Sequence, residues 1–527
     1  MEERKQEQTH QQIQNQALQP EVDEHRLFMR AEYAFFGGLT ALYALFYTFC
    51  LYRNTSGITY PFFVAGTLCY FYLCIRKSRV PWKKESGFYL VSLILLGISV
   101  CLTDNEYINI LTGFGIIFLF LSLMIHQYAD DERWNFSKYL YVIFQIMIET
   151  VACMGHPVSD GNAWFREREK TGRLGKGRYV ILGILILIPL LILILALLVS
   201  ADAVFLELFR QLFRFVNIWN CIGITLMIIC VFFIFYSFIA MLNKHLITDE
   251  CVEKRNQEPI LAITVNSVLA IVYLVFCGIQ VVYLFFGKGG LPTGYTYAAY
   301  ARQGFFQLLA VCLINLVIVL TCLAFFRESK VLKVILTVIS LCTYIMVASS
   351  AYRMLLYIRV KHLTFLRVLV LWGLIVIALI LAGIIVSVFR QNFRLFRYIT
   401  VVVTVCYIFL AFMRPDYWIA SYNMNFVDRE ETGEALTTEQ STDTGIWECR
   451  EYDDFRYLSG LSADAAPVLL SAENYSFLTE TASTGYGTNW MDSFYRKVSE
   501  KAEKCGIRTF NFSRYTAGRL LDQAAEE

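Results

Sequence analysis

Asp202 interrupts a strongly apolar stretch, LLVSADAVFLELFRQLFRF, which runs from Leu197 to Phe215. The tetrapeptide Ser-Ala-Asp-Ala around it recurs at residues 462–465, in a polar part of the chain. After Asp202 the apolar residues recur at helical spacing, which predicts an amphipathic helix in the outer membrane interface. A carboxylate in front of such a helix accepts hydrogen bonds from its first N–H groups. We therefore favour helix capping for Asp202 and Asp464, and keep a proton or cation site at Asp202 as the alternative.

Two basic islands lie at the ends of later apolar stretches. Arg302 and Gln303 begin one of them, while Arg353 and Tyr357 stand one helical turn apart in another, with Arg367 close behind. Arginines at a membrane surface either extend outward to anchor a helix or bind an anionic headgroup, a substrate or a partner. Both interpretations stay open, and these five residues, with Asp202, are candidate contacts for an anionic lipid or an envelope protein.

Few polar residues lie inside the apolar stretches, and Asn266 and Asn315 are the two on consecutive stretches. Such side chains more often bond neighbouring helices than bind substrate. No Asp, Glu, Lys or Arg stands at the centre of a confident stretch. Proton-driven pumps typically need a carboxylate there, so the pattern argues against one. It leaves room for a carrier of apolar or neutral molecules.

Catalytic and metal-binding patterns give no positive signal. The sequence has no HExxH, no GxSxG and no Cys/His cluster at zinc spacing, and GKGG at residues 287–290 lacks the context of a phosphate loop. The acidic run Asp130, Asp131 and Glu132 is interpreted as a solvated loop. We therefore expect neither an enzyme nor a cofactor or metal.

The composition is that of a membrane protein. It is 57% hydrophobic and 17% charged, against about 25% charged residues in soluble domains. About 20 apolar residues cross the hydrocarbon core as a helix, and eleven segments qualify. They are 33–52, 58–75, 87–103, 107–126, 178–200, 217–242, 260–286, 304–326, 331–352, 366–389 and 396–413. The expected fold class is all-α, a polytopic helical membrane protein with a small helical carboxyl-terminal module.

The distribution of Lys and Arg predicts the topology. Segment 139–155 is a twelfth candidate span, but it is short and carries Gln145 and Glu149. If it does not cross, far more Lys and Arg residues lie inside than outside, as bacterial membranes require. If it crosses, the two sides become nearly equal. We predict eleven spans, an inner amino terminus, an outer carboxyl tail, and segment 139–155 in the inner interface or re-entrant.

The two tails differ in character from the middle of the chain. Residues 1–30 are polar and Gln-rich, which predicts a disordered lead-in before the membrane domain at 31–413. Residues 414–527 carry 11 Lys and Arg against 20 Asp and Glu, which does not suit nucleic-acid binding. Within this tail, 428–445 reads as a flexible loop and helical patterns return at about 453–473, 488–504 and 513–525, with Ser513 as the expected cap of the last.

Several segments between about residues 180 and 515 together resemble a bacterial family of multi-pass membrane proteins. They are ALLVSADAVF, YTYAAYARQGFFQLLAV, YRMLLYIRVKHLTFLR, RPDYWIASYN, FRYLSGLSADAAPVLL and FNFSR. The family is domain of unknown function 4173, within the broader 4153 group. Lys361-His362 departs from the family pattern, which tends to have Tyr-Gly before Leu-Thr. The resemblance implies an integral membrane protein and brings no activity or functional residue.

Three functions compete for this sequence. The preferred hypothesis is a non-enzymatic structural, regulatory or partner-binding protein of the bacterial cytoplasmic membrane, whose outer tail and basic rim form the interaction surface. A transporter or lipid flippase for a neutral or amphipathic substrate is the alternative, supported by the number of spans and by Asn266 and Asn315. An enzyme acting on lipid-linked substrates would need converging acidic or His residues, and no convincing set is present.

Overall fold

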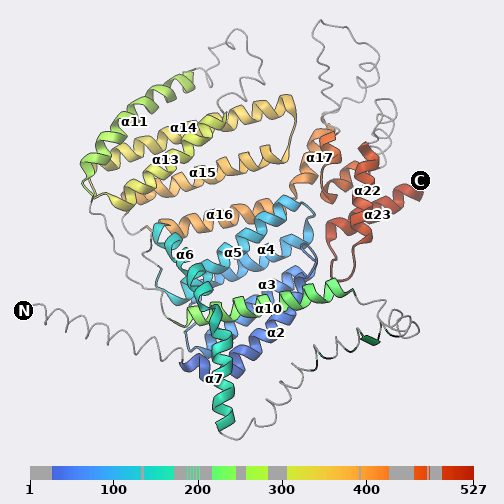
Figure 1. The fold of residues 1–527 in the computed structure, drawn as a ribbon. Coiled ribbons are helices and arrows are strands. Elements are labelled where there is room, and N and C mark those ends of the chain that lie inside the picture. The colour runs from blue at the N-terminus through green and yellow to red at the C-terminus, as the bar shows by residue number, and fades with distance from the viewer. Residues whose placement is uncertain are drawn as a thin grey trace, which may run out of the picture.

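A computed structural model describes most of the chain. The described residues are 27–170 except 132, 133 and 135, then 217–244, 257–282, 305–425 except 391 and 392, 456–471 and 490–526, with isolated positions between 187 and 201 and Asn474. Figure 1 shows long helices lying side by side in an up-and-down bundle, with shorter helices gathered at one end.

The first half of the bundle contains five long helices around one core. They are α2 (Tyr33–Leu51), α3 (Thr59–Lys77), α4 (Gly87–Leu102), α5 (Glu106–Tyr128) and α10 (Ile218–Leu242). Large side chains such as Phe36, Phe71 and Tyr236 are fully buried between them. Asparagine caps begin two of the helices, because Asn105 accepts from Ile108 N at 3.0 Å and Asn217 accepts from Trp219 N at 3.0 Å.

The second half contains α11 (Pro259–Gln280), α13 (Phe305–Phe325), α14 (Lys330–Lys361), α15 (Phe365–Phe389) and α16 (Leu395–Phe412). Helix α16 packs against both α15 and α4, and so joins the two halves. Helix α14 has 32 residues, or about 48 Å, which exceeds the roughly 30 Å of a hydrocarbon core. It ends well beyond the predicted boundary at residue 352, so its last turns leave the apolar belt.

The carboxyl-terminal module occupies one end of the bundle, called here the tail end. It contains α17 (Pro415–Asn425), η4 (Ala463–Ala465), α20 (Ala466–Leu469), α22 (Trp490–Glu503) and α23 (Phe512–Glu526) around its own small core. The opposite end, called the basic end, is where α2 begins and where several cations gather, among them Arg76, Lys77, Lys83, Lys84, Arg394 and Arg397.

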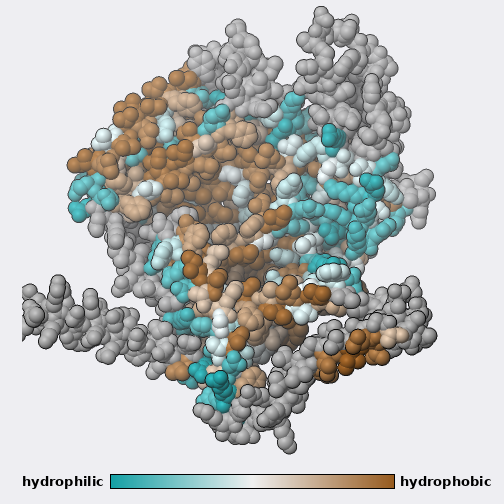
Figure 2. All heavy atoms as spheres, in the orientation of Figure 1, coloured by the Kyte–Doolittle hydropathy of each residue, from teal (hydrophilic) through white to brown (hydrophobic). Residues whose placement is uncertain are grey.

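The surface of the bundle suits a bilayer. Among the described residues, ten helices are long and apolar enough to cross a membrane by length and composition. Their outer faces expose large apolar side chains, such as Leu42, Phe118 and Val275. Figure 2 shows brown apolar surface over the middle of the molecule and teal surface on the module and toward the basic end. The protein is therefore a polytopic all-α membrane protein, as predicted.

The segment between α5 and residue 171 is a long helical stretch that does not cross the bundle. It contains α6 (Phe136–Ala152), η2 (Cys153–Gly155) and α7 (His156–Lys170), and its composition alone would admit it as a span. At its start, Tyr139 stacks on Phe396 with ring centroids 3.9 Å apart, at the basic end. Farther on, Asp160 accepts from Tyr236 Oη at 3.2 Å, near the same end. The contacts therefore place both parts of the stretch at the basic end, and that this end is the inner one stays a prediction.

Helix α3 is the converse case. It lies between α2 and α4 over their full length, and its Tyr70 bonds Thr40 at 2.8 Å in mid-bundle. It is not among the ten helices that are apolar enough to span, but Thr67 and Tyr70 are buried in the bundle, so 58–75 stays a predicted span. Ten of the eleven predicted spans thus coincide with described helices, and the remaining one, 178–200, lies outside the described residues.

Candidate functional site

Asp104 is a fully buried carboxylate in the short turn between α4 and α5, at the tail end. Two cations of the module reach it from outside the bundle. Lys501 Nζ of α22 donates to Oδ2 at 2.9 Å, and Arg514 Nε of α23 donates to Oδ1 at 2.6 Å. Both cations are only about one-fifth exposed. A buried charge is costly unless it is paired, so these contacts fix how the module sits on the bundle.

Asp464 is a second buried carboxylate at the same junction, and its predicted role was wrong. Ser462, not Asp464, caps the short helix η4, since its hydroxyl accepts from Asp464 N at 3.4 Å. The Asp464 carboxylate instead accepts from the Thr103 hydroxyl and from Arg414 Nε, the latter at 3.3 Å. Arg414 has a positive φ of 52°, a conformation that costs free energy and is kept only where the surroundings enforce it.

The side chain of Asn511 links the bundle to the first turn of the last helix. Its Nδ2 donates to three carbonyl oxygens of the bundle, of which Ser56 and Thr103 are each at 3.0 Å. Its Oδ1 accepts from Ser513 N at 3.0 Å and so caps α23. The prediction that Ser513 caps this helix was therefore wrong by two residues.

Asp416 completes the set of buried carboxylates at the junction. It begins α17 and is 3% exposed, and it accepts from Ser462 N at 3.0 Å. Burial raises the pKa of Asp416 above its usual value, although hydrogen bonds from Ser462 partly oppose the shift and the Asp464 charge adds to it. Three of the segments quoted for the family resemblance, RPDYWIASYN, FRYLSGLSADAAPVLL and FNFSR, therefore meet at this one junction.

The predicted basic island on α14 and α15 separates into two local contacts. Arg353 is 7% exposed, and its Nη2 donates to Gln280 Oε1 of α11 at 3.2 Å. Arg367 lies over the Tyr357 ring, 4.5 Å from its centroid, and donates to the carbonyl oxygens of Lys361 and His362. Tyr357 and Arg367 thus come together, and Arg367 closes the end of α14.

His362 occupies the turn that Arg367 closes. Its backbone has φ 58° and ψ −176°, a region that is essentially restricted to glycine. A glycine at this position, which the resemblance implies for related chains, would adopt this backbone without strain. The sequence departure at this position therefore introduces local backbone strain.

Asn266 and Asn315 are both buried between helices of the second half. Asn266 Nδ2 donates to its own helix at Ala262 O and approaches Cys322 Sγ of α13 at 3.4 Å. Asn315 Nδ2 donates to Thr343 Oγ1 of α14 at 3.0 Å. Both side chains bond neighbouring helices, as expected of such residues. Arg302, Gln303 and Asp202 lie outside the described residues.

A second polar cluster lines a small cavity at the basic end. His126, in the last turn of α5, lies with its Nδ1 2.7 Å from Asp131 Oδ1, and the Tyr139 hydroxyl donates to the other oxygen of Asp131. Both the His126 and Asp131 side chains are about nine-tenths buried. The interpretation of Asp130, Asp131 and Glu132 as a solvated loop was therefore wrong for Asp131.

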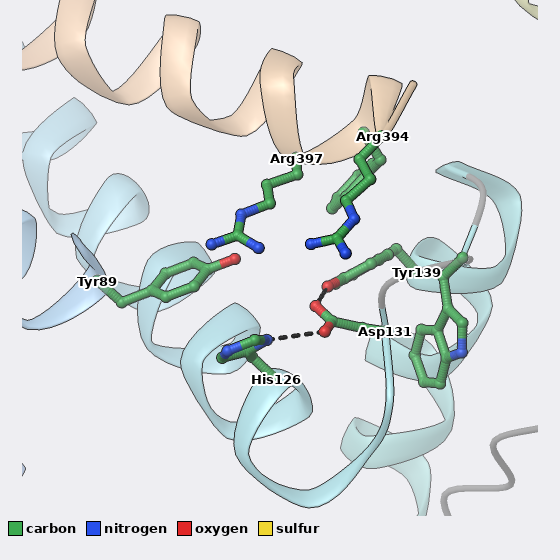
Figure 3. A pocket seen from close by; sticks show the side chains of 8 residues that line it. Tyr89, His126, Asp131, Tyr139, Arg394 and Arg397 are labelled. Carbon is green, nitrogen blue, oxygen red and sulfur yellow. Dashed lines mark hydrogen bonds and ion pairs between the residues drawn. The ribbon is translucent and has the colours of Figure 1, made fainter. Parts of the chain in front are cut away.

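Two arginines from the start of α16 cover this cavity. Arg397 forms an ion pair with Glu85 at the cavity mouth, where both side chains are partly exposed. Figure 3 shows the guanidinium groups of Arg394 and Arg397 pointing from α16 toward the Tyr89 hydroxyl and Asp131. The cavity volume is about 20 Å³, room for roughly one water molecule.

The sequence contained a weak signal for this cluster. A histidine in the last turn of an apolar helix, with an aspartate five residues later, places an imidazole and a carboxylate at one membrane edge. Arg394 and Arg397, however, follow some 260 residues later, and only the packing of α16 against α4 brings them close. Within the described residues, no group of three or more His, Cys, Asp or Glu side chains could hold a metal ion.

Comparison with known proteins places most of the chain in one family. A family model described as Domain of unknown function (DUF4153) matches residues 90–472. The matched region contains Asp104, Asp416 and Asp464 at the junction and His126, Asp131, Arg394 and Arg397 at the cavity, while Glu85 and Tyr89 precede it and Lys501, Asn511 and Arg514 follow it. No curated protein and no solved structure matches the chain.

Proposed function

The chain belongs to the family described as Domain of unknown function (DUF4153), and from this premise we propose a non-enzymatic role as an envelope scaffold. In this proposal the module is a docking platform for another envelope protein. The segments at the junction support placing the chain in the narrower 4173 group. The protein is an integral membrane protein, and the bacterial cytoplasmic membrane is its proposed location.

The observation that carries this proposal is the burial of Asp104 against Lys501 and Arg514. Pairing charges in a protein interior gains little net stability, but it penalises every other arrangement of the same parts. Arg414, about one-third exposed, and the fully buried Asp464 add a second ion pair at the same junction. A module held in one orientation loses less conformational freedom when a partner binds. The ionisable groups here are committed to one another, which favours a structural role over catalysis.

The distribution of cations supports an orientation in which the module lies outside the cell. Lys and Arg residues accumulate on the cytoplasmic side of bacterial membrane proteins, and here they gather at the basic end. The amino terminus then lies in the cytoplasm and the module outside the cell. Helix α22 turns an exposed polar row away from the bundle, at Asp492, Arg496 and Glu500. We propose this row as the face that a partner contacts.

Transport is less well supported. Besides the number of spans, it rested on Asn266 and Asn315 lining a central cavity, and the Nδ2 groups of both instead donate to neighbouring helices, although their Oδ1 atoms are buried without a partner in the part of the chain that the structure describes. A flippase or carrier for a neutral substrate would have to use residues elsewhere in the chain.

Photo-crosslinking in cells tests the scaffold. A benzophenone amino acid at position 496 is expected to give one discrete protein adduct, and the same group at exposed Lys330, on the basic end, is not. Asp104→Asn should lower the adduct yield at 496, because the module loses its fixed orientation. Absence of an adduct from 492, 496 and 500, or a yield that Asp104→Asn leaves unchanged, contradicts the proposal.

A further inference from the structure

The cavity at the basic end has the chemistry of an anion site, and we infer that it binds a phosphate group. This inference concerns the opposite end of the molecule from the proposed platform, and shares with that proposal only the orientation of the bundle in the membrane. The ligand chemistry is a phosphate oxygen carrying negative charge, either on a membrane lipid headgroup or as free phosphate.

The donors of the site converge from different helices. Arg394 and Arg397 come from the first turn of α16, Tyr89 from the first turn of α4, and His126 from the last turn of α5. A guanidinium group offers five N–H donors in a planar fork, so the Glu85 pair does not exhaust those of Arg397. Forked donors match phosphate oxygens better than a point charge does.

His126 provides the independent observation. Its residue is 6% exposed, and its Nε2 is buried with no hydrogen-bond partner among the described residues. Asp131 holds the other ring nitrogen and fixes the ring orientation. Because Nδ1 is engaged by Asp131, Nε2 is the ring nitrogen left for a ligand, and an imidazole nitrogen can either donate to a phosphate oxygen or accept from a phosphate hydroxyl. A buried polar atom without a partner is costly, and a bound oxygen removes that cost.

The size and depth of the cavity define how the ligand enters. A volume of about 20 Å³ admits roughly one oxygen atom, judged by the space that one water needs. The rest of the phosphate then lies at the mouth, between Arg397 and Glu85. The lining residues stand where the helices leave the apolar belt, which is the depth of lipid headgroups. Basic pockets between helices at the cytoplasmic face are known sites for phosphate-bearing headgroups.

Binding of phosphatidylglycerol to the full chain in detergent tests the inference. Arg394→Gln and Arg397→Gln should each weaken binding about tenfold, the loss expected for one charge-assisted hydrogen bond. Arg397→Lys should weaken it less, because the charge remains and the fork is lost. Glu85→Gln should strengthen it, because a competing carboxylate leaves the mouth. The matched control is Arg390→Gln, an exposed arginine at the same end that does not line the cavity.

Two further experiments distinguish a lipid headgroup from free phosphate and test the site without a substitution that could misfold the protein. Displacement of the lipid by inorganic phosphate indicates a free-phosphate site, and persistence of the lipid indicates a headgroup site; both support phosphate binding. A photoactivatable phosphatidylglycerol should label peptides containing Tyr89 or Trp134 in the unmodified protein, without any substitution. Equal lipid binding by Arg394→Gln, Arg397→Gln and Arg390→Gln, or labelling that avoids those peptides, overturns the inference.

Discussion

The carboxylate of Asp104 and the ammonium group of Lys501 lie 2.9 Å apart, although 397 residues separate them in the chain. Asp104 belongs to a turn of the membrane bundle and Lys501 to the module, so the pair ties two separately packed cores together. Arg514 shares the same carboxylate from a second helix of the module. The module is therefore attached by charges that neither core needs for its own packing.

Replacing Lys501 should loosen the module without unfolding the bundle. Lys501→Met removes one of the two cations on Asp104, and a hydrogen bond to a charged group is worth about 1.5–3 kcal/mol. We expect faster protease cleavage within residues 456–526 and a lower unfolding temperature in detergent. Lys504→Met, at an exposed position directly after the same helix, is the control and should behave as wild type. Equal protease resistance of the two variants would show that the pair does not hold the module.

Gly57 should be equally sensitive, for a steric reason. A Cβ atom at this position would lie closer than 3.0 Å to the carbonyl oxygen of Arg508 and to the side chain of Asn54. Gly57→Ala must push the segment before α23 away, and so break the hydrogen bond from Ile58 N to Phe510 O, now 2.7 Å long. We expect faster amide hydrogen exchange around Phe510 in this variant.

Gly38→Ala is the matched control for that experiment. A Cβ atom at Gly38 meets nothing within 4 Å, and alanine is favoured over glycine inside a helix by about 0.5–1 kcal/mol. The control should leave exchange in the module unchanged. A module that exchanges at the wild-type rate in Gly57→Ala would mean that the close approach at Arg508 is not retained in solution.

Asp416 gives the junction a dependence on pH. Because burial raises its folded pKa above the usual 3.8, the native state holds this proton more strongly than the unfolded state does. Its contribution therefore favours the fold at low pH and is lost as pH rises through the raised pKa. Asp416→Asn removes this loss of folding stability with rising pH, and keeps an oxygen that accepts from Ser462 N. The unfolding temperature of the variant, relative to wild type, should increase from acid to neutral pH.

Other carboxylates titrate in the same range, so the difference between variant and wild type is the quantity to follow. Asp492→Asn, an exposed position on α22, controls for the loss of a surface charge. If the two asparagine variants show the same pH dependence, burial of Asp416 is not the cause.

Replacing His362 should stabilise the protein. Its φ of 58° and ψ of −176° suit glycine, and the strain of another residue in such a region is about 1–3 kcal/mol. After subtracting the entropy cost of glycine, His362→Gly should gain about 1 kcal/mol. The gain is read as a higher unfolding temperature. Lys361→Gly, one residue earlier within α14, should instead lose about 1 kcal/mol, and a gain in both variants would rule out strain at His362.

The helices could be predicted because crossing a bilayer demands long apolar runs, and such runs are local in sequence. Segment 139–155 belongs to a stretch that is apolar enough to span a membrane, so its placement in the inner interface stays a prediction that rests on the positive-inside rule. The bounds failed where a helix outlasts its apolar run, as α14 does by continuing to Lys361.

The sites could be predicted only where their partners are close in sequence. Asp464 precedes a short helix, so capping was the natural interpretation. Thr103 and Arg414, which engage its carboxylate, are brought there by tertiary packing that periodicity cannot reveal. The burial of Asp131 was missed for the same reason. Its partners His126 and Tyr139 are close in sequence, but Arg394 and Arg397, which cover the cavity, come from a distant helix. Arg367 and Tyr357 were grouped correctly because only the short turn between α14 and α15 separates them in the chain.

Sidedness reporters test the arrangement on which both proposals depend. Reporters placed after residues 135 and 177 should face the cytoplasm, because the helical stretch between them contacts the basic end at both Tyr139 and Asp160. A reporter after residue 440 should face the outside, because the module lies at the tail end. Opposite results at 135 and 177 would mean that this stretch crosses the membrane, which would invert the sidedness of everything after it. The phosphate site keeps its inner position only if α4, α5 and α16 begin or end on the cytoplasmic side together, so a reporter after residue 440 that faces inward would also contradict the inference for that cavity.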